Sequence, residues 1–136
     1  MMKTGYRYVT LRYVHDVVTE EFVNVGVVVF APDHHFLRAR FSTNCVRLNG
    51  MFGQIDEAHF KATIEHLEVA FTNQSEHLEP GVKDIHDLVG RILPADDSSL
   101  QWSRSGGGLT RDPSETLNHL FSRFVERYME ETPVPA

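Results

Sequence analysis

The chain has 136 residues, of which 41% are hydrophobic and 24% charged, and its formal net charge is −6 at pH 7. This length supports one domain with a real core, without metal or disulfide staples. The negative charge argues against non-specific binding to nucleic acid or anionic lipid, which requires a basic surface.

The single cysteine, Cys45, excludes an intrachain disulfide and a multi-cysteine zinc site. This fits a reducing cytoplasm. The first residues lack the apolar segment of a signal peptide, and the longest apolar run, residues 25–32, is far too short to span a bilayer. We therefore expect a soluble cytoplasmic protein without a membrane contact.

Three segments near the N-terminus have the sequence pattern of β-strands. Residues 6–14 alternate in the strand manner, and β-branched and aromatic side chains dominate them. Residues 22–30 are apolar except at two positions, and residues 36–41 alternate again. Because short connections join the three segments, the sequence predicts an antiparallel meander.

The two exceptions in the second strand are Asn24 and Gly26. Glycine weakens a strand unless a bulge or a close backbone approach requires it, and a buried asparagine is costly unless it is hydrogen-bonded. The two residues are two positions apart, so we expect them on one side of the strand. Val23, Val25, Val27 and Val29 then occupy the other side and face the helices. The polar side should accommodate a bulge, a buried hydrogen bond or a partner.

Helical periodicity begins after residue 55. Asp56 is a suitable N-cap, and it is followed by an apolar stripe at helical spacing. A second helix is predicted over residues 82–93, a short fourth strand over residues 100–103 and a glycine-containing loop over residues 104–110. Asp112 and Pro113 mark the start of the last helix.

The sequence therefore predicts an α+β fold, in which an antiparallel sheet of three to four strands packs one face against two to three helices. Residues 1–131 form a single domain, and residues 132–136 form a flexible C-terminal tail. The predicted core consists of Val9, Leu11, Val25, Val27, Val29, Leu37, Phe60, Ile64, Leu67, Leu117, Phe121 and Phe124.

Histidine and cysteine give no metal or catalytic signature. The eight histidines form no pair with chelating spacing, so they are better explained as surface residues, and we expect neither a metal nor a cofactor. Cys45 would be a nucleophile only if a histidine approached it in space. A small buried side chain is the more common role of a free cysteine.

The loop of residues 104–111 is the best candidate for anion binding. Arg104, Arg111, the amides beside three glycines and the following helix N-terminus could together hold a phosphate. However, Asp112 occupies those helix amides and repels an anion, and there is no lysine at the phosphate-loop position. A connection without a ligand explains this loop better.

Polar side chains on the predicted strands form a second candidate. Arg12, Asn24 and either Arg38 or Arg40 could share the sheet face that the helices leave open. Such an arginine strip, with Tyr6, Tyr8 and Phe36, is typical of surfaces that hold single-stranded nucleic acid, and it is equally typical of a cross-strand network. Glu20 and Glu21 precede the second strand and could bind a metal or transfer protons, or simply form an exposed turn.

Two further sequence elements resemble the start of a known family. These are Tyr-x-x-Leu-Arg-Tyr-Val at residues 8–14 and Glu-Phe-Val-Asn-Val-Gly-Val-Val-Val-Phe at residues 21–30. Together with residues 36–41, Arg47-Leu48, residues 108–113 and residues 117–121, they resemble the bacterial DUF3037 family, which has no assigned function. The resemblance covers roughly residues 6–128. It marks these positions as candidates: Arg12, Glu21, Asn24, Gly26, Arg40 and Arg47.

Members of this family are similar to proteins encoded beside a HipA-like kinase, which implies an accessory role with such a partner. We therefore expect a non-catalytic protein-interaction module with a protein partner or a homo-oligomeric state. The alternative is a small enzyme or nucleic-acid-processing protein that uses Arg12, Glu21, Asn24 and Arg40 as a polar cluster in a cleft. Single-stranded nucleic-acid binding is a third hypothesis, which the acidic net charge disfavours.

Overall fold

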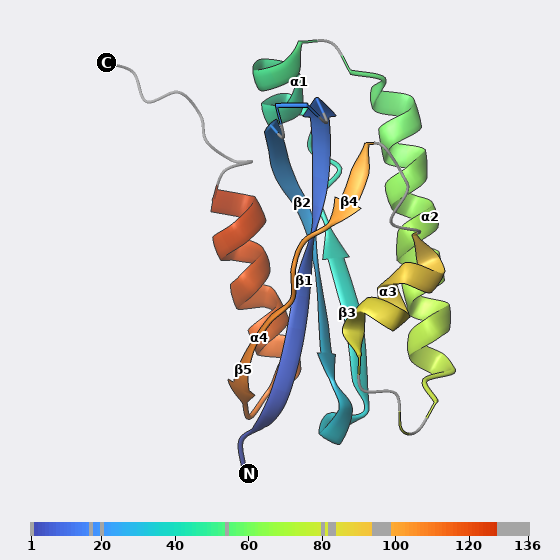
Figure 1. Cartoon of the computed structure of the whole chain (residues 1–136), viewed down its shortest axis with the longest axis vertical. Coiled ribbons are helices and arrows are strands. Elements are labelled where there is room, and N and C mark those ends of the chain that lie inside the picture. Colours follow the sequence, from blue (N-terminus) through green and yellow to red (C-terminus); the bar gives the residue numbers. More distant parts are fainter. Residues whose placement is uncertain are drawn as a thin grey trace.

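The computed structural model describes residues 2–16, 18–19, 21–53, 55–79, 81, 84–93 and 99–127. In this part of the chain, five strands form one open antiparallel sheet with four α-helices around it (Figure 1). The α+β class is confirmed, and the fifth strand and fourth helix exceed the expected numbers. The tail of residues 132–136 lies outside the described residues.

The sheet is built around one long strand. β1 (Thr4–Asp16) pairs along one side with β2 (Glu21–Ala31), which in turn pairs with β3 (Phe36–Phe41). The other side of β1 pairs with β4 (Leu100–Trp102) and, further along, with β5 (Gly106–Thr110). All pairs are antiparallel, so the predicted meander of the first three strands is confirmed.

β5 lies where its glycines predict a loop, so that prediction is wrong. The glycines allow close packing beneath aromatic rings: a Cβ at Gly106 would lie 2.5 Å from the Tyr8 ring, and one at Gly108 would lie 3.0 Å from the Tyr6 hydroxyl. Tyr8 and Tyr6 are the β1 residues that pair with these two glycines. Glycine is used here because the backbone of one strand lies under a ring of its neighbour.

The helices are α1 (Val46–Phe52), α2 (Glu57–Glu76), α3 (Ile85–Ile92) and α4 (Pro113–Phe121), which continues as the π-helical segment η2 (Ser122–Glu126). The Asp56 and Asp112 side chains accept hydrogen bonds from backbone amides of the first turns of α2 and α4, as expected of N-caps. The N-cap residue of α1, Cys45, makes no side-chain capping hydrogen bond, and the sequence does not predict this helix. The predicted start of α3 at Val82 and its stop at Pro94 lie outside the described residues.

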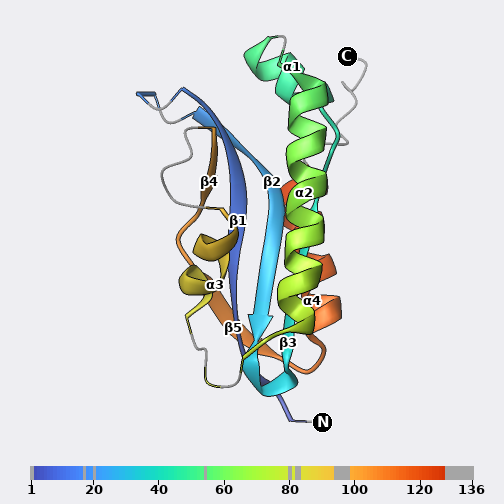
Figure 2. The same ribbon diagram turned by 90° about the vertical axis from the view of Figure 1, so that its right-hand side faces the viewer.

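Both faces of the sheet carry helices. Tyr8 stacks on Phe124, just after α4, with ring centroids 5.6 Å apart. The next residue, Val9, points to the other face and packs in a cluster with Phe71 of α2 and Leu88 of α3. In Figure 1, α4 accordingly lies to one side of the strands and α2 and α3 to the other, while Figure 2 shows α2 running along much of the sheet.

The expectation that the helices cover only one face is therefore wrong. The reason is the continuous apolar run of β2, in which Val27, Val28, Val29 and Phe30 are all at most 1% exposed. Such a run is typical of a strand buried on both faces rather than on one. All predicted core residues are buried, except that Phe124 is partly buried against the larger core cluster.

Candidate functional site

A β-bulge at Val25 decides where the polar residues of β2 point. Leu11 pairs with Gly26, but Arg12, the next residue of β1, pairs with Asn24, so one residue of β2 is left over. Leu11 and Arg12 are consecutive and therefore point to opposite faces. Asn24 consequently lies with Arg12 on the α4 face, and Gly26 lies on the α2–α3 face.

The bulge confirms one of the alternatives that glycine predicts, and it corrects another expectation. Asn24 and Gly26 do not share a side of the strand, and Val23 and Val27 do not either, because they pair with Tyr13 and Thr10. All five valines at positions 23–29 are still buried, since helices cover both faces. The extra residue in a bulge interrupts the period of two on which the expectation rested.

Gly26 is required by the ring of its neighbour on β3. A Cβ at this position would lie 2.8 Å from Cε1 of Phe41 and closer still to its Cδ1. The Phe41 ring is held in turn by Phe71 of α2, with centroids 5.9 Å apart. Gly26 is therefore a packing residue rather than part of a ligand site.

Arg12 and Asn24 form a half-buried polar pair on the α4 face. The Arg12 guanidinium lies over the Phe22 ring, 4.1 Å from its centroid. The buried Nε of Arg12 and the buried Oδ1 of Asn24 have no hydrogen-bond partner, although one is a donor and the other an acceptor. Buried polar atoms without partners are uncommon in folded proteins, so this pair is an unusual polar feature of the sheet.

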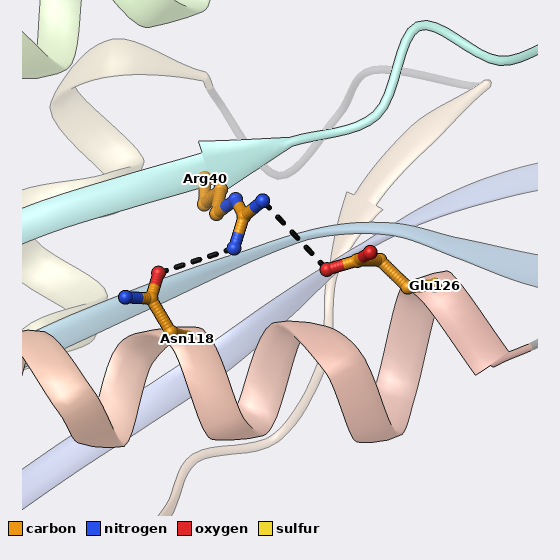
Figure 3. Close-up of polar contacts among 3 residues, drawn as sticks. All are labelled: Arg40, Asn118 and Glu126. Atoms are coloured by element: carbon orange, nitrogen blue, oxygen red, sulfur yellow. Dashed lines mark hydrogen bonds and ion pairs between the residues drawn. The ribbon is translucent and has the colours of Figure 1, made fainter.

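Arg40 ties β3 to the helix on the same face. Its Nη1 donates a hydrogen bond to Oδ1 of Asn118 at 3.1 Å, and its Nη2 lies 3.7 Å from Oε1 of Glu126 (Figure 3). The guanidinium also lies over the Phe121 ring, 4.4 Å from its centroid. Arg12, Asn24 and Arg40 thus share one sheet face as expected, but α4 covers this face, so it is not the open strip suited to nucleic acid.

The remaining candidates lie elsewhere. Glu21 is exposed at the first position of β2, and Glu20, expected beside it, is outside the described residues. Arg47 is half-buried on α1. The exposed Arg104 and Arg111 flank β5, whose pairing with β1 removes the loop on which the anion site was based.

Neither histidine nor cysteine forms a reactive arrangement in the described part of the chain. No three histidine, cysteine, aspartate or glutamate side chains there could hold a metal ion. His15 stacks flat on Phe52 at 4.6 Å, which is a packing role. Cys45 is buried, and its burial, followed by the nearby Glu57 carboxylate, raises the pKa of its thiol. A raised pKa disfavours the nucleophilic thiolate.

A groove of about 470 Å³ lies between β3 and α2. Five consecutive residues of β3, 37–41, form one wall, and α2 contributes Glu68, Phe71, Thr72, Ser75 and Glu76. Among the described strands, β3 pairs with β2 alone, so its other edge is free along this groove. Sequence reasoning predicted β3 but missed the groove, because only the position of α2 creates it.

The hydrogen-bonding groups at this edge can be assigned from the register. The backbone amide of Ser42 donates a hydrogen bond to the carbonyl of Val25. In an antiparallel pair every second residue makes such bonds, so Arg40 and Arg38 are hydrogen-bonded to β2. The alternate residues, Leu37, Ala39 and Phe41, therefore direct their N–H and C=O groups away from β2. Three residues thus present backbone donors and acceptors to the groove.

These features define an α+β protein with an open antiparallel sheet and an accessible sheet edge. The chain belongs to the family DUF3037, a protein family of unknown function, which matches it over residues 8–125. No curated protein and no solved structure is significantly similar to it. None of the described helices is long and apolar enough to cross a membrane.

Proposed function

We propose that this protein is a non-catalytic interaction module that takes up an extended segment of a partner protein at the free edge of β3. The single observation that carries the proposal is the groove of about 470 Å³ along β3 and α2, into which the outward backbone groups of that strand point. Addition of a strand to an exposed sheet edge is a common mode of peptide recognition, in which backbone hydrogen bonds supply the affinity.

The groove is more consistent with an added strand than with a small substrate. Its walls combine backbone with the polar side chains of α2, and none of its residues is histidine, cysteine or lysine. The family resemblance supplies the finer part of the proposal, that the partner is a HipA-like kinase and that the protein acts as its accessory.

A proline at position 39 tests this proposal. Ala39→Pro removes an N–H that points away from β2, so the sheet keeps its own hydrogen bonds, whereas a strand in the groove loses a donor. Ala39→Ser, which keeps the N–H, is the matched control. Tagged wild-type protein and both variants would be used to capture partners from the native host, with folding checked by circular dichroism.

The expected result is a captured protein that the Ser variant retains and the Pro variant loses. Hydrogen exchange on the wild-type chain gives a second readout, in case the Pro variant does not fold. The amides of Leu37, Ala39 and Phe41 should become protected when the partner is added. A partner that binds the folded Pro variant undiminished and leaves these amides unprotected would sink the proposal.

The second candidate is a small enzyme or nucleic-acid-processing protein that uses Arg12, Glu21, Asn24 and Arg40. The unpartnered Nε of Arg12 and Oδ1 of Asn24 favour it, because a bound polar group would satisfy both atoms. Its test is the double variant Arg12→Ala, Glu21→Ala. If this variant folds and keeps partner capture but loses an assayed activity, the interaction-module proposal fails.

A further inference from the structure

The charges along the groove are separated onto its two sides. On the α4 face of β3, Arg38 is exposed, and its guanidinium lies 5.6 Å from the centroid of the Phe36 ring. On the opposite face, Glu68 and Glu76 of α2 line the groove and are exposed. Arg40 and Glu126 form an ion pair. Arg38, Glu68 and Glu76 have no ion-pair partner among the described residues.

A strand added at this edge would therefore meet opposite charges on its two faces. Its side chains that point to the α4 face lie across from Arg38. Its alternate side chains point to the face of Phe41, where Phe71 of α2 packs, and so approach Glu68 and Glu76. A neutral or uniformly charged segment would match at most one of the two faces.

A second copy of this chain fits the same edge poorly in the registers that pair most of β3. Two β3 strands related by two-fold symmetry would pair antiparallel, and residues on the same face would lie opposite each other. A register centred on Ala39 places Arg38 of one copy opposite Arg40 of the other. A register centred on Arg38 places Arg38 opposite Arg38 of the other copy, and a register centred on Arg40 does the same for Arg40. Like charges directly opposite are destabilising, so pairing between copies is disfavoured.

From this layout we infer that the β3 edge recognises an extended partner segment in which acidic and basic side chains alternate. The acidic residues lie across from Arg38 and the basic residues lie against Glu68 and Glu76. The inference rests on the proposed function and adds to it the chemistry of the partner. Backbone hydrogen bonds to Leu37, Ala39 and Phe41 give the affinity, and the alternation gives the specificity.

Two capped octapeptides of identical composition test this chemistry. One alternates four glutamates with four lysines, and the other has the glutamates and lysines in two blocks. Both have the same charge, but only the alternating peptide presents one sign on each face of a strand. Binding to the full chain is followed by amide chemical shifts in two-dimensional NMR spectra.

The alternating peptide is expected to shift the amides of Leu37, Ala39 and Phe41 and to bind about tenfold more tightly than the block peptide, as two or three cross-strand charge pairs would give. The variants Arg38→Glu and Glu76→Lys should each weaken the alternating peptide several-fold. Both positions are exposed, so folding should be preserved.

Equal binding of the two peptides, shifts that map outside the groove, or no binding at millimolar peptide would each overturn the inference. These failures differ from that of the proposed function. If neither peptide binds but Ala39→Pro still abolishes capture of the natural partner, the edge is a docking site with another specificity. If Ala39→Pro leaves partner capture intact, the proposed function itself fails.

Discussion

Replacement of Gly26 by alanine should destabilise the protein through one specific contact. The added Cβ would lie 2.8 Å from Cε1 of Phe41 and 3.2 Å from the backbone oxygen of Arg40. The ring cannot move away freely, because it packs against Phe71, which itself contacts Trp102 with centroids 5.8 Å apart. A methyl group at this position therefore overfills the core.

The expected size follows from two opposing effects. Overpacking of a core costs about 1–3 kcal/mol. Replacing glycine by alanine restricts the unfolded chain, which offsets about 0.4–1 kcal/mol of that cost. The net loss should be about 1–2 kcal/mol, and the urea midpoint should fall by about 0.5–1 M for a typical denaturant slope. Urea titration followed by circular dichroism measures both quantities.

The matched control is Gly5→Ala. Gly5 lies in β1 and, like Gly26 of β2, has a negative φ, but a Cβ there would meet nothing within 4 Å. This variant should be as stable as the wild type or slightly more stable. Phe41→Leu supplies a rescue, since a smaller side chain relieves the contact, and the double variant with Gly26→Ala should lose less stability than the sum of the single variants. A Gly26→Ala protein as stable as Gly5→Ala, or a strictly additive double variant, would refute the reasoning.

Three further predictions concern the cysteine, a helix cap and the contacts of one arginine. Burial and Glu57 raise the pKa of the Cys45 thiol. Iodoacetamide at pH 8 should therefore modify the native chain far more slowly than the urea-unfolded chain. Mass spectrometry measures both rates, and equal rates would contradict this prediction. Asp112→Ala should lower the free energy of unfolding by about 1 kcal/mol in thermal melts, because two amides of α4 lose their acceptor, and an unchanged melting temperature would exclude that role. Arg40→Met should lower the free energy of unfolding by less than about 1 kcal/mol, because the Arg40 and Glu126 side chains are 45% and 32% exposed. A loss several times larger that does not depend on salt would show that the ion pair is stronger than its exposure implies.

Much of the fold can be predicted from the spacing of apolar residues in the sequence. The alternation in the first three strands and the short connections between them predict the meander, and Asp56 and Asp112 predict the starts of two helices. These signals are local, since each depends on side chains a few residues apart. α1 escapes prediction because it has only seven residues and its N-cap residue is a cysteine, which is not a typical capping residue.

The errors have a different origin, because they depend on residues distant in the sequence. The glycines of β5 are typical of a loop until Tyr6 and Tyr8 of β1 are placed above Gly108 and Gly106. The groove beside β3 likewise depends on the position of α2, which no pattern within β3 reveals. Local sequence patterns therefore predict most helices and strands, but not how these elements pack against one another.

Val25 illustrates why the candidate site was only partly predictable. The sequence shows that a polar residue and a glycine are required in a buried strand, and a bulge is a known reason for such a pair. It does not show which residue is the extra one, and that choice decides which face receives Asn24. With the extra residue at Val25, Asn24 joins Arg12 under the face that carries α4, while Gly26 packs beneath Phe41 on the other. The six marked positions therefore do not form one site. Packing of a ring explains Gly26, and contacts with α4 and η2 explain Arg40. The Arg12–Asn24 pair retains two buried polar atoms for which the described structure supplies no hydrogen-bond partner.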